Sequence, residues 1–262
     1  MTQPISANRP PLSAWQVQQL RFTVFPFPSI TAIEYQDYTW WTELTGEPPE
    51  TKVYKPRTRA HQEMGPFEQG KLSLITEPTR IDWRYEVVDS EELTSEMLPT
   101  IGSFPDIKGN FTQPMRQWLE LDTCPSIQRL AFGAILLQSV KNRQSGYSLL
   151  SNYLPNIRLD PDGSSDFMYQ INRPRFSNLG IEGLSINRLT KWSVLTIKSG
   201  IVKPEKLFLD RIPIEEHFAC RLELDINTFQ DFDKGFLREQ LPLVFSELVE
   251  LGEEITVNGD IQ

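Results

Sequence analysis

Basic side chains occupy every second position in one short run of this sequence. They are Lys55, Arg57, Arg59 and His61. Because the side chains of a β-strand point alternately to its two faces, a strand over residues 52–61 would place all four on one face. Such a row of cations can bind a phosphate, a nucleic acid or an acidic partner. The row can also be a solvated edge strand whose charge prevents aggregation, and Pro56 favours that interpretation.

A second, looser basic set lies in the later half of the chain. Its members are Arg173, Arg175, Arg188 and Lys191, and Arg80 with Arg84 forms a similar set in the first half. A groove shared by the two halves would collect these cations into one anion site. Alternatively, they pair with carboxylates on neighbouring strands, as cross-strand charges commonly do. The carboxylates available for such pairs are Asp82, Glu86, Glu223 and Asp225.

Acidic residues concentrate at the C-terminal end of the sequence. Residues 223–262 hold 10 acids and 2 bases, whereas residues 1–222 hold 25 acids and 24 bases, so most of the net charge of -9 lies in this last segment. The acids that we expect to face a partner are Glu239, Glu247 and Glu250. A negative net charge disfavours general binding to nucleic acid or to an anionic membrane. Another protein is therefore the expected partner.

Standard catalytic and metal-binding patterns are not found in the sequence. The two histidines are His61 and His217, and the sequence contains no serine nucleophile elbow or reactive cysteine motif for which either could act as the general base. The acidic turn over residues 160–166 resembles part of a calcium loop, but Ile171 stands where such a loop needs a bidentate glutamate. Glycine-rich phosphate loops are absent as well. We predict no catalytic residue, no metal and no cofactor, so an enzyme of this sequence would depend on carboxylates, arginine or lysine.

The cysteine content and the start of the sequence indicate a compartment. Cys124 and Cys220 are the only cysteines, and we expect both to be reduced and partly buried. The sequence has no run of about 18 apolar residues and no basic-then-apolar signal peptide. We therefore expect a cytoplasmic protein without a membrane segment.

Two successive series of patterns would position these residues. The first unit covers residues 14–125 and follows an extended arm over 1–13. We expect it to begin with a strand from Val17, with Leu20, Phe22 and Val24 inward. A short helix at 35–44, strands at 52–61, 70–76 and 80–88, and a helix firm from Gln113 should follow.

The second unit covers residues 126–262. We expect a strand at 129–140, a helix at 145–154, and strands at 167–173, 184–197 and 220–226. Its last element should be a helix at 232–251 that is kinked or split in two at Pro242 and ends at Gly252. The order repeats at a spacing near 110 residues, which suggests an internal duplication.

Short motifs in the second half resemble a sporadically distributed bacterial family of uncharacterised proteins of about 250 residues. Gly183, Ile186, Asn187 and Arg188 match the glycine and isoleucine-asparagine-arginine strand of that family, and the run Leu224-Asp-Ile-Asn227 matches its later strand except that Asn227 replaces an aspartate. The resemblance implies a bacterial source. It implies no activity.

The sequence thus predicts an α+β fold of two pseudo-repeated βαβββα-like units, with antiparallel sheets each covered by a helix. Two classes of function stay open. The first is a non-enzymatic binding or assembly protein, such as an accessory subunit of a bacterial multi-component system. The second is a carboxylate- or arginine-based enzyme acting on a phosphate-bearing substrate. Convergence of Lys55, Arg57 and Arg59 with acids in one concave pocket would favour the enzyme, and an exposed arrangement would favour the binding protein.

Overall fold

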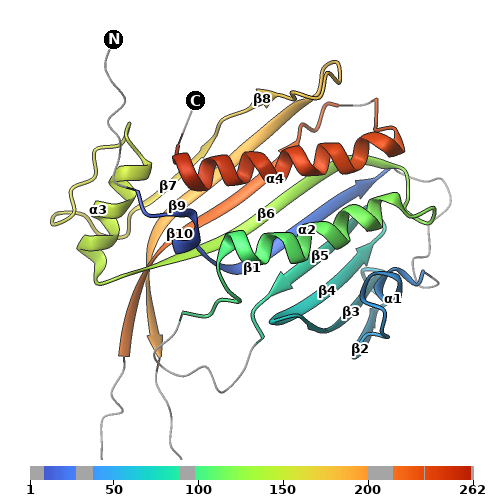
Figure 1. The fold of residues 1–262 in the computed structure, drawn as a ribbon, viewed down its shortest axis with the longest axis horizontal. Helices are drawn as coiled ribbons and strands as arrows, with labels where there is room; N and C mark the ends of the chain where they lie inside the picture. The colour runs from blue at the N-terminus through green and yellow to red at the C-terminus, as the bar shows by residue number, and fades with distance from the viewer. Residues whose placement is uncertain (1–8, 28–37, 89–97, 200–214, 233, 261–262) are drawn as a thin grey trace, which may run out of the picture.

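The fold is α+β and is built on one large antiparallel sheet (Figure 1). The structure, a computed structural model, describes residues 9–27, 38–88, 98–199, 215–232 and 234–260. Ten described strands form the sheet in the order β2-β3-β4-β5-β1-β6-β10-β9-β7, and β8 also pairs with β9. The strands of the two halves of the chain are therefore continuous in one sheet.

Each half of the chain supplies five strands. The first half contains η1 (Leu12–Ala14), β1 (Gln16–Pro26), α1 (Trp40–Thr45), β2 (Thr51–Lys55), β3 (Ala60–Phe67), β4 (Gly70–Glu77), β5 (Arg80–Glu86) and α2 (Phe104–Glu120). The second half contains β6 (Ile127–Val140), α3 (Arg143–Tyr153), β7 (Met168–Asn172), β8 (Arg175–Phe176), β9 (Ser185–Ser199), β10 (Glu215–Thr228), η4 (Arg238–Gln240) and α4 (Leu241–Asn258).

Strands β1 and β6 join the two halves at the middle of the sheet. Phe22 of β1 lies opposite Phe132 of β6, and Leu20 lies opposite Ala134. The predicted inward face of β1 is confirmed, because Leu20, Phe22 and Val24 are fully buried. The outer neighbours of this central pair are β5 on one side and β10 on the other.

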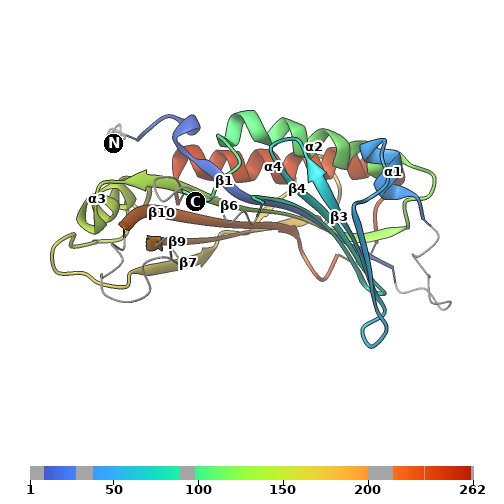
Figure 2. The same cartoon turned by 90° about the horizontal axis from the view of Figure 1, so that it is seen from below.

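Helices cover one face of this sheet. Helices α2 and α4 contact each other, α2 packs on β1, and α4 packs on β6 and β10. Figure 2 shows the sheet from its side, with α2 and α4 on one face only. We call the opposite face the helix-free face, and none of the described helices lies on it. No described helix is long and apolar enough to span a membrane.

Aromatic side chains fill the space between the sheet and its helices. Trp192 of β9 is fully buried, and its ring centroid lies 5.5 Å from that of Tyr153 and 6.1 Å from that of Trp15. Around α2, the rings of Trp40 and Trp118 pack edge to face at 5.2 Å. Edge-to-face contacts add to the free energy that burial of such rings already contributes.

Two helix boundaries differ from the expected ones. Helix α2 begins at Phe104 with a proline in its first turn, so the prediction that its firm part begins near Gln113 is wrong, and Pro114 is accommodated inside the helix. Helix α4 begins at Leu241, and Pro242 therefore starts it instead of kinking it. The helix does not end at Gly252 but continues to Asn258. Gly252 lies inside the helix against the ring of Phe132, where a Cβ would be 3.1 Å from a ring carbon.

The N-terminal segment is less extended than predicted. Residues 1–8 lie outside the described part of the chain. Leu12–Ala14 forms a single 3-10 turn, and the Arg9 Nε donates a hydrogen bond to the carbonyl of Asn152 at 2.8 Å. The segment is therefore anchored on α3.

Candidate functional site

The basic run 52–61 folds as a hairpin, which corrects the prediction of one strand. Lys55 is the last residue of β2 and pairs with Ala60 at the start of β3, so the chain reverses between them. The Lys55 carbonyl accepts a hydrogen bond from the Thr58 N–H at 3.2 Å, which closes a turn with Pro56 as its second residue. Arg59 adopts the left-handed conformation with φ 53. Proline favours this turn position, whereas the alternation of basic residues gave no sign of the reversal.

Lys55, Arg57 and Arg59 nevertheless lie together, at the tip of this hairpin. All residues from Thr51 to Arg59 are exposed, and none of the three cations forms an ion pair with a described residue. We call these three residues the basic tip. They do not converge with acids in a pocket, which was the condition that favoured the enzyme.

His61 does not belong to the basic tip. It lies in β3, half-buried, and its ring stacks on that of Tyr54 of β2 with centroids 4.4 Å apart. This stacked pair supports the hairpin behind the tip. Strand β2 itself is exposed along its whole length and is the last described strand at this edge of the sheet.

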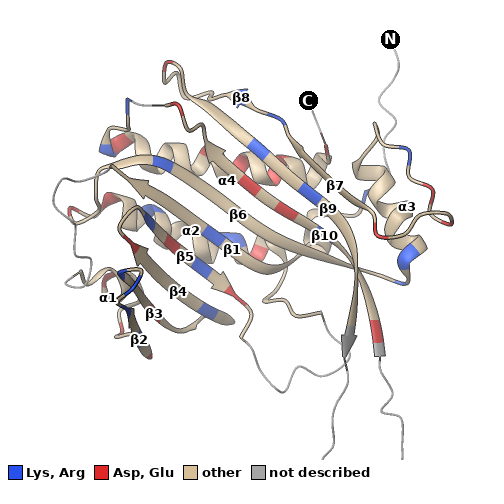
Figure 3. Cartoon of the chain, turned by 180° about the vertical axis from the view of Figure 1, so that it is seen from behind, with Lys and Arg blue, Asp and Glu red and all other residues tan. Residues whose placement is uncertain are grey.

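The helix-free face carries charged residues on several strands (Figure 3). They include the cations Arg80, Arg84 and Lys191, which the sequence suggested as part of an anion site or as members of ion pairs. Asp82 of β5 is almost fully buried and forms the centre of one group, which we call the Asp82 cluster. Its carboxylate accepts a 2.5 Å hydrogen bond from the Thr23 hydroxyl and lies 2.7 Å from the Arg80 Nε and 3.5 Å from the Arg84 Nη2. One carboxylate thus serves two guanidinium groups.

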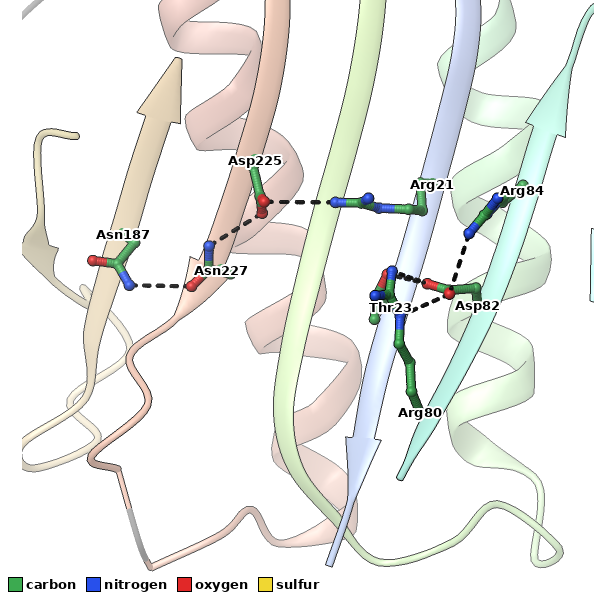
Figure 4. Close-up of polar contacts among 8 residues, drawn as sticks. All are labelled: Arg21, Thr23, Arg80, Asp82, Arg84, Asn187, Asp225 and Asn227. Carbon is green, nitrogen blue, oxygen red and sulfur yellow. Dashed lines mark hydrogen bonds and ion pairs between the residues drawn. The ribbon is translucent and has the colours of Figure 1, made fainter. Parts of the chain in front are cut away.

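Asp225 of β10 begins a second group on the same face, drawn with the first in Figure 4. Its carboxylate accepts a hydrogen bond from the Asn227 amide at 3.1 Å, and Asn227 in turn accepts one from Asn187 at 3.1 Å. Arg21 of β1 approaches Asp225 from the other side, with 3.6 Å between Nη2 and Oδ2. The distance is longer than a hydrogen bond, so this ion pair is loose.

Gly133 of β6 gives the Arg21 side chain room to approach Asp225. It lies between Arg21 and Asp225 in the register of the three strands. A Cβ at this position would be 3.2 Å from the Arg21 Nε and 3.3 Å from its Nη2. An added side chain would therefore require the guanidinium to shift by a few tenths of an ångström.

A shallow hollow of about 290 Å³ opens beside Gly133. Arg21 and Gln19 line one side, Glu223 and Asp225 line another, and Lys191 closes it from β9. The Lys191 Nζ lies 3.1 Å from Glu223. The hollow therefore holds both cations and carboxylates, all of them partly exposed.

Cations outnumber carboxylates in the ion pairs of the helix-free face. Six cations share four carboxylates in these pairs. The cations are Arg21, Lys71, Arg80, Arg84, Lys191 and Arg221, and the carboxylates are Asp82, Glu86, Glu223 and Asp225. The predicted pairing with a carboxylate on a neighbouring strand is confirmed for Lys191, which pairs with Glu223 of β10, whereas Arg80 and Arg84 pair with Asp82 of their own strand β5.

The other predicted cations, Arg173, Arg175 and Arg188, lie near one another beside α4. Arg173 forms two 2.9 Å hydrogen bonds to the carboxylate of Asp260, and this interaction holds the pKa of Asp260 below its usual value. Arg175 pairs with Glu254 at 3.1 Å. Burial lowers the pKa of the fully buried Arg188. These arginines bind their own chain, and they do not share a groove with Arg80 and Arg84.

The predicted acidic face divides into different environments. Glu247 is buried, and its carboxylate accepts hydrogen bonds from the Ser177 hydroxyl at 2.5 Å and from the Asn178 N–H at 2.6 Å. It holds the loop after β8, so its assignment to a solvent-facing partner surface is wrong. Glu239 and Glu250 are exposed, as that assignment requires.

Both cysteines are free and buried. Burial raises the pKa of Cys124 to about 12 and that of Cys220 to about 12. Neither thiol ionises near neutral pH, so neither is a nucleophile in the folded protein.

Comparisons of the chain with family models, with curated proteins and with solved structures found no match. A function for this chain therefore has to be inferred from its sequence and its geometry alone.

Most residues of the helix-free face were not predicted as site residues. Thr23, Gly133, Asn187 and Asn227 carry no charge, and their importance follows from neighbours on other strands. A usable signal was present in β10, where Arg221, Glu223, Asp225 and Asn227 alternate with apolar residues. This alternation predicts a polar face, but it does not show which strands complete it.

Proposed function

We propose that this chain is a non-enzymatic binding or assembly protein and that its basic tip contacts an acidic surface of another protein. One observation carries the proposal. Lys55, Arg57 and Arg59 are exposed without an acidic partner among the described residues, while the cations on the helix-free face share carboxylates. In a bacterial multi-component system, such a protein would be an accessory subunit. Because cysteines without disulfides are typical of proteins in a reducing compartment, we also propose a cytoplasmic location.

Physical reasons favour a contact at this place. Long-range attraction depends on charge that is not already neutralised by neighbours, and it acts within about 8 Å at physiological ionic strength. The three cations of the tip satisfy that condition on a protein whose net charge is -9. The same net charge opposes extended contact with a nucleic acid, which would need a larger basic surface.

Strand β2 adds apolar surface next to the tip. Val53 is 38% exposed and Tyr54 is 53% exposed. Exposed aromatic and apolar side chains beside cations are typical of the centre of protein interfaces. Because the two side chains point to opposite faces of β2, a partner that contacts the basic tip from one face would cover one of them.

Charge reversal at the tip tests the proposal. The variant Lys55→Glu/Arg57→Glu/Arg59→Glu should lose its protein partners in pull-downs from the source cell, and binding of the wild type should weaken as salt rises. A matched control places the reversal on the helix-free face with Lys71→Glu, which should keep the partners. The proposal fails if the triple variant keeps every partner, and partners lost after nuclease treatment alone would identify a nucleic acid.

The exposed acids of the C-terminal segment are a second candidate contact of the same function. Glu250 lies on the outer side of α4 and Glu239 lies in η4. Reversal of Glu250 to Lys in the same pull-down would identify this surface. Glu247 is not changed in this test, because its loss would leave the loop at Asn178 without its acceptor.

An enzyme acting on a phosphate-bearing substrate is the alternative, and the hollow beside Gly133 favours it. Arg21 and Lys191 could hold a phosphate there, while Asp225 and Glu223 could accept or donate a proton. Turnover of a simple phosphate ester by the wild type, lost in Lys191→Ala and kept in the tip variant, would support this alternative over binding.

We propose in addition that the two halves arose by duplication. Each contains a strand, a helix, four strands and a helix, which is one strand more than the predicted βαβββα-like unit. Phe22 and Phe132, 110 positions apart, face each other at the middle of the sheet. Related sequences that fail to align at this offset would count against it.

A further inference from the structure

A groove runs along α4 on the side of the β8 loop and is not explained by the interactions described above. Its volume is about 410 Å³. It is lined by Arg175, Leu179, Leu243, Glu247, Glu250 and Glu254, among others. Three carboxylates and one guanidinium give this lining a net negative charge.

The rim of the groove is apolar and exposed. Leu243 of α4 is 56% exposed and Leu179 of the opposite loop is 38% exposed. The two leucines give the groove an apolar border that a bound molecule would remove from water. Glu250 lies next to them, is exposed, and forms no ion pair with a described residue.

We infer that this groove receives the basic tip of a second copy of the chain. The inference rests on the proposed function and names the acidic surface that the tip contacts. The two surfaces are complementary in charge, since the tip has three unpaired cations and the groove has an excess of carboxylates. They are also complementary in apolar content, because Val53 and Tyr54 lie behind the tip and Leu179 and Leu243 border the groove.

The positions of the two surfaces determine the form of the assembly. The tip ends the hairpin at the β2 edge of the sheet, whereas the groove lies beside β8, which pairs with β9 near the opposite edge. An interface between different patches is heterologous, so each copy keeps one unused patch. Copies would therefore add head to tail, as a ring or an open chain.

The like net charge of two copies does not prevent this contact. Repulsion between molecules of charge -9 acts over long distances and is largely screened at about 0.15 M salt, where the Debye length is about 8 Å. Ion pairs at the contact are closer than that length and are screened less. Association should therefore exist at physiological salt and weaken at about 1 M salt.

Light scattering of the purified full chain tests the inference. The mean mass of the wild type should rise above that of one chain as protein concentration increases. Lys55→Glu/Arg57→Glu/Arg59→Glu, the tip variant, and Glu250→Lys, the groove variant, should each weaken self-association by about tenfold or more. The control Glu120→Lys makes the same charge change as Glu250→Lys at an exposed position at the end of α2 and should associate like the wild type.

Mixing the two variants gives the decisive result. The tip variant retains a groove and the groove variant retains a tip, so an equimolar mixture should form a complex of two chains that neither variant forms alone. A larger assembly should not appear, because each chain in that complex lacks its second working patch.

A wild type that is one chain at every concentration, or a mixture that yields no complex, overturns the inference. Self-association that Glu250→Lys leaves unchanged overturns the choice of groove. The proposed function would survive these results if the tip variant still loses another acidic partner in the pull-down. The proposed function would fail together with the inference if the tip variant lost neither self-association nor a partner in the pull-down.

Discussion

On the helix-covered face of the sheet most of the buried side chains are aromatic or apolar, with Trp15, Tyr153 and Trp192 in mutual contact, and Arg188 is a buried exception. On the helix-free face the most buried side chain with a charge is that of Asp82, held by a hydroxyl and two guanidinium groups. The first face is stabilised by removal of apolar area from water, and the second by hydrogen bonds and ion pairs that remain near water. Mutations should therefore have different costs on the two faces.

The largest expected effect comes from the covered face. Trp192→Ala should lower the free energy of unfolding by about 3–5 kcal/mol, because it removes a fully buried ring and leaves a cavity against Trp15 and Tyr153. Denaturant titration measures this loss. The neighbouring Ser193→Ala, whose side chain faces away from the core, should change it by less than about 0.5 kcal/mol. A stable Trp192→Ala protein that loses only its binding would make Trp192 a site residue.

The next effect compares two aspartates of the helix-free face. The Asp82 side chain is 5% exposed and that of Asp225 is 40% exposed. Asp82→Ala should cost about 1–3 kcal/mol, since it leaves Thr23 and two guanidinium groups without their acceptor. Asp225→Ala should cost less than about 1 kcal/mol. Equal costs in the same titration would show that burial does not distinguish these positions.

A smaller effect should appear only in acid. The pKa of Asp260 is lowered in the folded protein, mainly by its hydrogen bonds from Arg173. A lowered folded pKa means that the stabilisation is present above the ordinary carboxyl pKa and is lost as pH falls toward the folded value. Asp260→Asn should lower stability by up to about 1.5 kcal/mol at neutral pH. The difference from wild type should shrink below pH 3.8, the ordinary value for the group. If the stability difference between Asp260→Asn and the wild type did not change with pH, the ion pair between Arg173 and Asp260 would not be its cause.

The smallest effect on stability belongs to the basic tip. Changing Lys55, Arg57 and Arg59 to Glu should shift the free energy of unfolding by less than about 0.5 kcal/mol, because none has an ion partner among the described residues. Thermal melts of the variant and the wild type provide the measurement. A large loss of unfolding free energy would mean that the tip supports the fold, as the two faces of the sheet do.

Local patterns predicted much of the fold because the physics behind them is local. The alternation in β1 gave the correct buried side, because Leu20, Phe22 and Val24 are fully buried. The start of α2 was missed because Pro114 looked like a first-turn residue, while the true first turn at Phe104 follows a loop with little periodicity. The boundary of α4 was missed for the converse reason, because Pro242 was interpreted as a kink inside a longer helix, whereas it lies in the first turn.

The site was harder to predict because it depends on contacts between distant residues. Basic residues in alternation predicted an exposed cationic surface, and the tip has one, although by a turn and not by a single strand. Nothing local distinguishes Glu247 from Glu250, since only the packing of the β8 loop buries the first. The role of Gly133 depends equally on Arg21, more than a hundred residues earlier.

The pairing of β1 with β6 has a consequence for how the chain folds during synthesis. Strand β1 can pair with β5 as soon as the first half has emerged, but its other edge has no partner until residues 127–140 follow. The other edge of β6 has no partner until β10, which lies near the end of the chain, has been synthesised. Pairings this distant in sequence slow folding and leave a strand edge open to other chains. A nascent chain stalled before Ile127 would expose an eleven-residue edge of β1, so the rate of translation through the second half should control how much of this protein aggregates.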